Sequence, residues 1–259
     1  MTQKISILIL LVYTTCFTSC RKIIDVSVNP TASQYVVQGN VIEDTGGHTV
    51  YLSRTIGLNE TNAFPAVSGA TVVLQDVSTN TFDTLRESKP GQYIAYRLIG
   101  IPTHTYKLWV KANGQEFTAT STMPKHVPLD SIYMDRAPIG NGLILHIIYT
   151  DPPELGNNYH LTQWVNDSLL SDILSTTDEV DNGNEVKRTI FTDYEYNRGD
   201  SLTVTLEAID KNVLTYYEGL EIVADQNSAT PANPKTNIVG GAIGYFSAHT
   251  NSTKILIVR

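Results

Sequence analysis

The residue best placed for covalent chemistry is Cys20, whose thiol closes a short apolar leader. Lys4 precedes the apolar residues 5–12, and small polar residues then lead to Ser19, directly before Cys20. This order of basic, apolar and small-residue segments is typical of a bacterial export signal. A cysteine at its end is where a signal peptidase leaves a lipid-modified N-terminus. We therefore expect residues 1–19 to be a lipoprotein signal peptide and Cys20 to carry acyl chains such as palmitate.

Three alternatives to this processing stay open. Cys16 follows two threonines and is a rival lipidation site, since Phe17 stands where leucine is usual before Cys20. A simple signal peptide and an uncleaved leader are the others. The apolar run is too short to span a membrane as a helix, so the chain would be anchored rather than spanning. With Cys20 lipidated and Cys16 removed, no thiol is left for redox chemistry or a disulfide.

A second motif with chemical meaning is Gly199-Asp200-Ser201-Leu202, which spells the nucleophile block of an esterase family. In that family the block lies near the mature N-terminus and a later Asp-x-x-His follows. Here the block is late and the chain contains no Asp-x-x-His. A Gly-Asp turn that enters a strand is the better interpretation. We predict no catalytic residues, and keep as an alternative a hydrolase whose carboxylates meet only in the fold. The candidates are Asp151, Glu154, Asp178 and Glu185.

The sequence predicts no metal site and no cofactor. The six histidines occur singly, without the close pairs that zinc sites use. Residues 178–183 resemble a calcium loop, but Val180 occupies the third ligand position and Thr189 the twelfth, where a bidentate Glu belongs. A solvated acidic loop is the preferred interpretation.

Charge argues against nucleic acid as a partner. The formal net charge is −8, and removing the leader with its single Lys4 leaves 17 basic against 26 acidic residues, or −9. Such a chain repels phosphate backbones. Arg21 and Lys22, beside the lipid site, are placed to contact anionic headgroups.

The elements that must position these residues are mostly strands, because β-branched and tyrosine-rich runs alternate with a period of two between Gly, Asn, Asp and Pro. We expect a mainly β fold of two β-sandwich-like domains. Residues 20–33 would be a lipid-anchored linker, 34–125 the first sandwich and 126–259 a second β-rich domain. The expected strands are 35–41, 49–55, 70–76, 82–87, 93–98, 105–112, 115–121, 131–136, 143–149, 159–165, 186–194, 202–209 and 254–258.

One segment of the second domain has a helical period instead. After Asp210, a suitable N-cap, the apolar residues Val213, Tyr217, Leu220 and Ala224 recur at helical spacing. This predicts one helix of about four turns. Residues 227–237, with two prolines, predict a loop.

Two tryptophans are the candidate ligand- or partner-binding residues. Alternation places Trp109 between Lys107 and Lys111, on the polar face of its strand. Trp164 shares a face with His160 and Thr162. Exposed aromatic rings stack on sugars or anchor protein partners. The competing interpretation is that both rings fill a contact between domains or lie under a loop.

The order of several short motifs resembles a Bacteroidetes lipoprotein family grouped as domain of unknown function 4249. The motifs are Cys20, residues 35–39, 50–55 and 67–72, Gly91-Gln92-Tyr93, Asp151-Pro152, Gly199-Asp200, Asn237-Ile238 and Gly244-Tyr245-Phe246. The resemblance implies a lipoprotein of the outer membrane, often encoded beside TonB-dependent receptors, without established activity or catalytic residues. The first domain also resembles the transthyretin-like, carboxypeptidase-regulatory-like sandwiches found on such receptors.

Three function classes follow. The preferred one is a non-catalytic outer-membrane lipoprotein that assists a TonB-dependent receptor by binding ligand or receptor. The second is a pilin-like structural or adhesive subunit, for which a free β segment at residues 254–259 would serve strand donation. The third is a glycan or ester hydrolase. Arg21 and Lys22 argue against a known surface-export signal while the family context favours the surface, so both membrane faces stay open.

Overall fold

The computed structural model describes residues 33–44, 46–57, 64–138, 142–224 and 233–259. Within these ranges the chain is mainly β with one helix, α2 (Lys211–Ala224). The alternation of residues predicted the strands, and the helical period after Asp210 predicted the helix. The expected signal peptide, with Cys16, and Cys20 lie outside the described residues, so lipidation stays a prediction. In the described ranges no helix combines the length and the apolar character that crossing a bilayer requires.

Most strands lie close to the expected positions, although the strands expected at 93–98 and 186–194 end at Ile94 and Ile190. In the first half they are β1 (Tyr35–Ile42), β2 (Thr49–Arg54), β3 (Thr71–Asp76), β4 (Thr81–Thr84), β5 (Arg86–Lys89), β6 (Gln92–Ile94), β7 (Thr105–Ala112) and β8 (Gln115–Thr122). In the second half they are β9 (Leu129–Arg136), β10 (Leu143–Thr150), β11 (Asn158–Val165), β12 (Ser168–Leu169), β13 (Leu174–Thr177), β14 (Glu185–Ile190), β15 (Ser201–Ile209) and β16 (Ile243–Ile257).

Three differences from the sequence expectation have physical reasons. The strand expected at 82–87 is two strands, because the chain passes from one sheet to another at the buried Leu85. The short β12 and β13 carry too few residues to show a period. β16 begins at Ile243 rather than at residue 254, and its buried polar residues Ser247, His249 and Thr250 hide the alternation.

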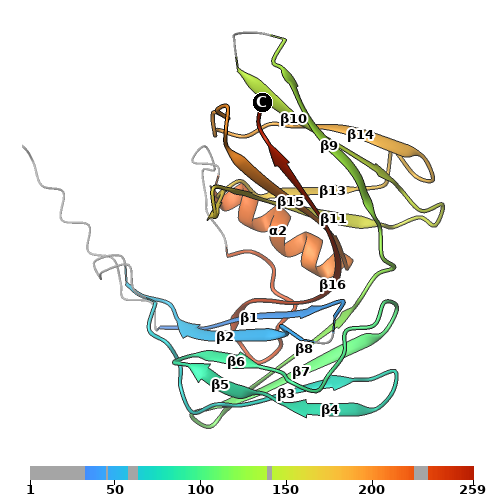
Figure 1. Ribbon diagram of the computed structural model, residues 1–259. Coiled ribbons are helices and arrows are strands. Elements are labelled where there is room, and N and C mark those ends of the chain that lie inside the picture. The colour runs from blue at the N-terminus through green and yellow to red at the C-terminus, as the bar shows by residue number, and fades with distance from the viewer. Residues whose placement is uncertain (1–32, 45, 58–63, 139–141, 225–232) are drawn as a thin grey trace, which may run out of the picture. The chain divides into compact units, whose positions relative to one another are not determined.

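β16 is the central strand of a nine-stranded sheet. The strand order is β12-β11-β15-β16-β1-β2-β6-β5, with β13 paired to β11. The first part of β16 runs parallel to β1, from Val36 opposite Ile243 to Ile42 opposite His249. The second part runs antiparallel to β15, where Thr250 lies opposite Ala208. Figure 1 shows β16 leaving β1 and continuing beside β15 to the C-terminus.

The parallel junction of β1 with β16 requires glycine at two positions. A Cβ on Gly244, at φ +105°, would lie 2.0 Å from the carbonyl oxygen of Val37. A Cβ on Gly39 would lie 2.9 Å from the ring of Phe246. Asn237 holds the backbone of Phe246, since its side-chain amide donates to the Phe246 carbonyl at 2.7 Å and accepts from the Phe246 N–H at 2.9 Å. The late Asn-Ile and Gly-Tyr-Phe motifs therefore build the junction.

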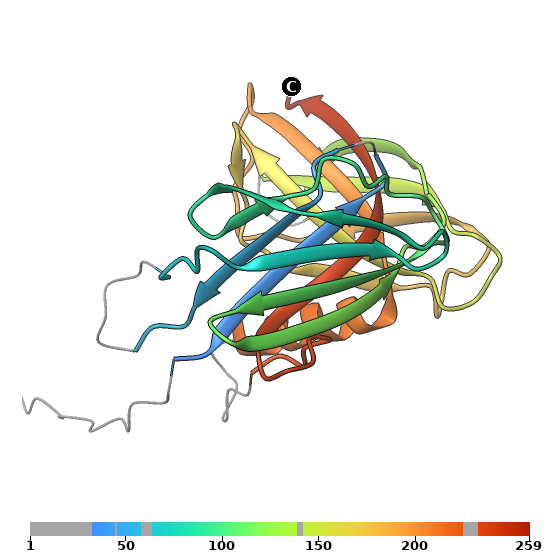
Figure 2. The same cartoon turned by 90° about the horizontal axis from the view of Figure 1, so that it is seen from below.

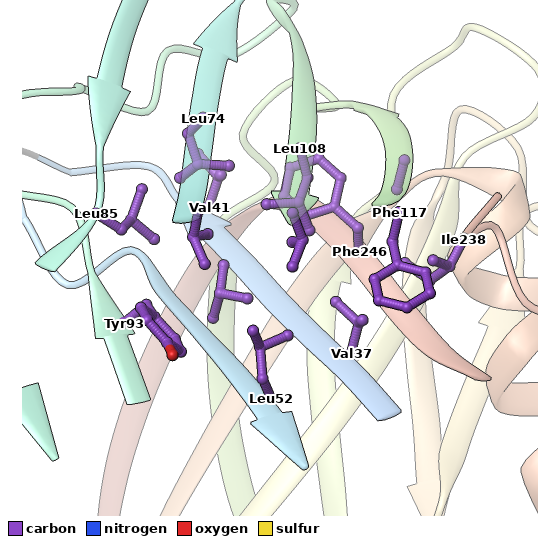
Figure 3. Packing of buried hydrophobic residues seen from close by; sticks show 14 of the residues in the cluster. Val37, Val41, Leu52, Leu74, Leu85, Tyr93, Leu108, Phe117, Ile238 and Phe246 are labelled. Atoms are coloured by element: carbon purple, nitrogen blue, oxygen red, sulfur yellow. The ribbon is translucent and has the colours of Figure 1, made fainter. Parts of the chain in front are cut away.

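A four-stranded sheet, β4-β3-β7-β8, packs against this junction and forms the first sandwich. Seen from below, the strands of this sheet lie over β1 and β16 (Figure 2). Figure 3 shows Phe246 in the same cluster as Val37, Leu108 and Phe117. Phe246 is fully buried, so β16 contributes a large side chain to a core made mostly of residues 35–123.

A three-stranded sheet, β14-β10-β9, packs on the other part of the large sheet and forms the second sandwich. Its core includes Leu202 and Leu206 of β15, Leu145 and Tyr149 of β10, and Leu161 of β11. Side chains alternate along a strand and paired residues share a face. Phe246 and Ala248 face the first core, so the next residues on that side are Thr250 and Ser252, opposite Ala208 and Leu206. Both small sheets therefore cover the same face of the large sheet.

Helix α2 begins where the sequence predicted. Asp210 accepts hydrogen bonds from the N–H groups of Asn212 at 2.8 Å and Val213 at 3.1 Å, which makes it the N-cap. The buried Val213 and Leu214 pack against Ile209. The helix contacts β11, β13 and β16 on the face of the large sheet that the small sheets leave uncovered.

The first core is built from residues between Tyr35 and Met123 together with Ile238, Ala242, Phe246 and Ala248, and the second from residues between Val127 and Ala208. The sequence placed those last four residues of the first core in the second domain, and the boundary between residues 125 and 126 stays a prediction. The segment at 254–257 is not free either. Leu256 pairs with Leu202 of β15, and Lys254 with Val204. Strand donation by this segment would require breaking that pairing.

Candidate functional site

The uncovered face of the large sheet carries a groove of about 630 Å³. Strand alternation explains its lining, because the side chains opposite the two cores all point into it. These are Asn40 and Ile42 of β1, Thr49 and Tyr51 of β2, His160, Thr162 and Trp164 of β11, Thr205 and Glu207 of β15, and Tyr245, His249, Asn251 and Thr253 of β16. Tyr217 of α2 and the connector 169–173 complete it. We call it the open-face groove.

The middle of the groove holds a hydrogen-bonded pair. His160 and Glu207 are cross-strand neighbours, and the His160 Nδ1 donates to the Glu207 carboxylate at 3.0 Å. The ring of Tyr217 stacks flat on the His160 ring, with centroids 3.9 Å apart and planes at 1°. Tyr217 thus covers the imidazole and holds its orientation.

A second imidazole, His249, lies buried nearby. Burial lowers the pKa of His249, which keeps the ring neutral at neutral pH. Burial would raise the pKa of Glu207, but His249 and His160 together outweigh it and lower that pKa. Glu207 is therefore an ionised carboxylate that accepts a hydrogen bond from His160.

Tyrosines line one end of the groove. Tyr245 lies 5.1 Å from the ring of Tyr216 and 5.5 Å from that of Tyr217, measured between centroids. The Asn40 amide donates to the Tyr245 hydroxyl at 3.4 Å. Burial raises the pKa of Tyr217 well above its ordinary value and that of Tyr216 to about 12, so both hydroxyls stay protonated.

Two large aromatic side chains remain accessible on the groove wall. Trp164 is 42% exposed and Tyr51 is 45% exposed. The Tyr51 hydroxyl accepts a hydrogen bond from the Gln92 amide at 3.0 Å, which fixes the position of the ring. Leu169, beside Trp164 in the β11–β12 pair, is also exposed. These rings are surfaces on which a ligand can stack.

Trp109, the other tryptophan singled out in the sequence, does not line this groove. It is half-buried on the outer face of β7, between the exposed Lys107 and Lys111. Lys111, at 3.1 Å, and the Trp109 indole both hydrogen-bond to Glu116 and lower its pKa. The structure thus separates the two candidates, and the binding role of each stays a prediction.

The groove is acidic rather than basic. Its lining includes Glu207 and Asp172 but no lysine or arginine. Arginines gather instead around a separate cavity of about 430 Å³, lined by Arg136, Arg198 and Arg259. A groove without fixed positive charge suits a neutral or cationic ligand better than an anion.

The carboxylates proposed for hydrolysis have structural partners. Asp151 is buried and accepts hydrogen bonds from the Tyr159 hydroxyl and, at 3.1 Å, from the Gly183 N–H. Asp178 accepts from the N–H groups of Gly156 and Asn157 at 2.7 and 2.9 Å. Glu154 pairs with Lys125 at the surface, and Glu185 is exposed at the start of β14. None of the four lines the open-face groove.

The esterase-like and calcium-like motifs are turns. Asp200 accepts from the Asn197 N–H at 2.8 Å, the Asn166 amide at 2.9 Å and the Tyr194 hydroxyl at 3.2 Å. The first two bonds outweigh burial and lower its pKa. In the acidic loop, Asp181 pairs with Arg188 at 2.8 Å. Among the described residues, no three His, Cys, Asp or Glu side chains are close enough to hold a metal ion.

Sequence patterns did not identify the central residues of the groove as a site. His160, Glu207, Tyr217, Tyr245 and His249 come from four elements and are brought together only by the pairing of β11, β15 and β16 and by α2. The sequence pattern that pointed toward the groove was the strand alternation that places His160, Thr162 and Trp164 on one face.

Comparison with known proteins gives a family and two distant structural likenesses. The profile of a family described as Domain of unknown function (DUF4249) matches residues 21–255. The sequence matches no curated protein. A cytokine receptor complex is 11% identical, with a TM-score of 0.27, over 84% of this chain and 94% of that chain. A chicken interferon gamma receptor alpha chain is 11% identical, with a TM-score of 0.22, over 68% and 88%. Likeness at these values carries no argument about function.

Proposed function

We propose that this chain, which belongs to the family described as domain of unknown function (DUF4249), is a non-catalytic binding protein whose ligand occupies the open-face groove. The observation that carries the proposal is the groove itself. Its volume of about 630 Å³ lies within the ~300–1,000 Å³ of small-molecule sites. It combines accessible rings with a few fixed polar groups, which is the usual composition of such sites.

The interactions of Glu207 give the groove a fixed polar group. Its carboxylate accepts a hydrogen bond from His160, and the ring of Tyr217 stacks on the His160 ring, so the pair is held in one orientation. The pair forms a rigid polar floor. Because neighbouring side chains already hold this floor in place, less conformational entropy is lost when a ligand binds.

The cellular setting that we propose is the outer membrane. Cys20 would anchor the chain through acyl groups, and the groove would present ligand to a TonB-dependent receptor beside it. The export-type leader and the family resemblance support this proposal. The membrane face stays open between periplasm and surface.

Lipidation is tested by metabolic labelling with an alkyne analogue of palmitate. Label should appear in the wild-type chain and in Cys16→Ala, and should be absent from Cys20→Ala. Label that survives Cys20→Ala but not Cys16→Ala would move the anchor to the rival cysteine. An unlabelled wild-type chain would remove the anchor altogether.

The receptor role is tested by purifying a C-terminally tagged chain from detergent-solubilised membranes and identifying co-purifying proteins by mass spectrometry. We expect a TonB-dependent receptor with the wild-type chain and a much lower yield of it with Cys20→Ala. Recovery of the chain alone would overturn the accessory role. A ladder of self-associated chains would favour the pilin-like alternative.

A further inference from the structure

We propose that the open-face groove binds a neutral saccharide chain, an inference that rests on the proposed function of this groove as the ligand site. The argument uses four properties of the groove: its length, its stacking surfaces, its hydrogen-bonding groups and its charge.

The groove is elongated. It follows β16 from Tyr245 to Thr253, a path of about 26 Å at about 3.3 Å per strand residue. Tyr51 is level with Gln38 and Tyr245 at one end, and Trp164 is level with Thr203 beyond Thr253 at the other. A long groove with a ring near each end suits a linear ligand of several units.

The two accessible rings suit the apolar faces of sugar rings. Trp164 and Tyr51 each present a flat aromatic face at the groove wall, and stacking buries apolar surface without needing a charge. Tyr51 is further held by Gln92, so its ring is ordered before a ligand arrives. Rigid aromatic side chains provide contact area at low entropic cost.

The groups between the rings match sugar hydroxyls. Thr162, Thr205 and Thr253 lie side by side in one row across β11, β15 and β16, and the last two hydroxyls are 2.8 Å apart. Asn251 follows in the next row, beside Glu207. Hydroxyls and amides both donate and accept, as the hydroxyls of a sugar do.

The same groups do not suit a peptide strand. Extended peptides are bound mainly through main-chain hydrogen bonds to an exposed sheet edge. The open-face groove lies on the face of the sheet, where the backbone groups of β15 and β16 are paired with each other. Only side chains are offered to the ligand.

Charge selects against anionic sugars. The lining contains Glu207 and Asp172 without lysine or arginine, so a uronate, sulfate or phosphate group would enter without a counter-charge. A neutral saccharide avoids this cost.

The test is a fluorescence titration of the full chain in detergent, with Trp109→Phe leaving Trp164 as the single tryptophan. The probes are malto-, cello- and manno-oligosaccharides of six units and an oligogalacturonate of the same length. We expect at least one neutral oligosaccharide to shift the Trp164 emission and to bind about tenfold more tightly than the galacturonate. A preference for the galacturonate, or no binding by any neutral member, would overturn the proposal.

Calorimetry on variants then locates the site. Trp164→Ala should weaken binding about tenfold, and Trp109→Ala, a tryptophan outside the groove, should leave it within about twofold. Thr205→Val is a second variant that keeps the shape and removes one hydroxyl, and it should also weaken binding. Circular dichroism confirms that each variant is folded. Unchanged affinity in both Trp164→Ala and Thr205→Val would refute the placement.

The outcomes separate the saccharide proposal from the proposed receptor role. If no sugar binds but the anchored chain still recovers its receptor, the saccharide class fails and the accessory role stands. If a sugar binds in the groove but no receptor is recovered, the saccharide proposal stands and the accessory role fails.

Discussion

Replacing Phe246 by alanine tests whether β16 makes the two sandwiches one folding unit. Phe246 is fully buried between β1 and the four-stranded sheet, and its ring lies against Gly39. Removing a buried phenylalanine side chain costs about 3–5 kcal/mol, because the lost burial and the cavity that remains both destabilise. Domains are stabilised by only about 5–15 kcal/mol in total, so this is a large share.

The assay is urea unfolding followed by the two tryptophans, which report on different sandwiches. Trp109 lies on β7 of the first sandwich, and Trp164 on β11, which contributes to the second core. In Trp164→Phe and Trp109→Phe backgrounds, each transition is followed alone. With a slope near 3 kcal/mol per molar, Phe246→Ala should lower both midpoints by about 1–1.7 M. Both should move together, because unfolding the first core releases the strand that pairs with β15.

The control is Ile255→Ala on the same strand. Ile255 is 69% exposed and belongs to neither core, so its loss should change the free energy of unfolding by no more than about 0.5 kcal/mol. If Phe246→Ala moves only the Trp109 transition, the sandwiches unfold separately and the reasoning about β16 is wrong. A shift below about 1 kcal/mol in both would refute the packing argument.

Three further predictions concern single residues. Gly244→Ala should prevent stable folding, because its Cβ would lie 2.0 Å from a backbone oxygen. Gly241 is also at positive φ but has open space around it, so Gly241→Ala should cost only about 1–2 kcal/mol of unfolding free energy. Thermal melting compares the two variants, and equal losses of stability would contradict the steric argument. Asp210→Ala should cost about 1–2 kcal/mol of unfolding free energy in urea and reduce helical circular dichroism, since two N–H groups of α2 lose their acceptor. Burial lowers the pKa of His48, so its stabilising effect is present above about pH 6.5 and is lost as the pH falls below that value. The melting temperature should therefore fall between pH 7 and pH 5, and less so in His48→Gln; an equal fall in both would exclude His48 as a cause.

Local patterns in the sequence predicted the strands and the helix well. The apolar alternation of residues 105–112 gave the bounds of β7, and the Asp210 cap with its helical period gave α2. The family resemblance was confirmed over residues 21–255. These features depend on neighbours in the chain, which a single sequence contains.

The open-face groove depends on distant pairing and could not be predicted in the same way. No local pattern indicates that residues 243–249 run parallel to β1, or that Glu207 lies beside both His160 and Asn251. Parallel pairing between the two ends of a chain is set by packing of the whole core. The glycines that permit it, Gly39 and Gly244, look like ordinary turn or strand residues in the sequence.

The position of β16 in the chain also bears on how the protein is made. Val37 emerges from the ribosome long before Gly244, its partner across the parallel junction. The first core cannot close until that late strand arrives, and until then its apolar strands and their unpaired edges are exposed to aggregation. The first core can therefore be completed only after β16 has been synthesised, so it forms late although most of its strands come early in the chain.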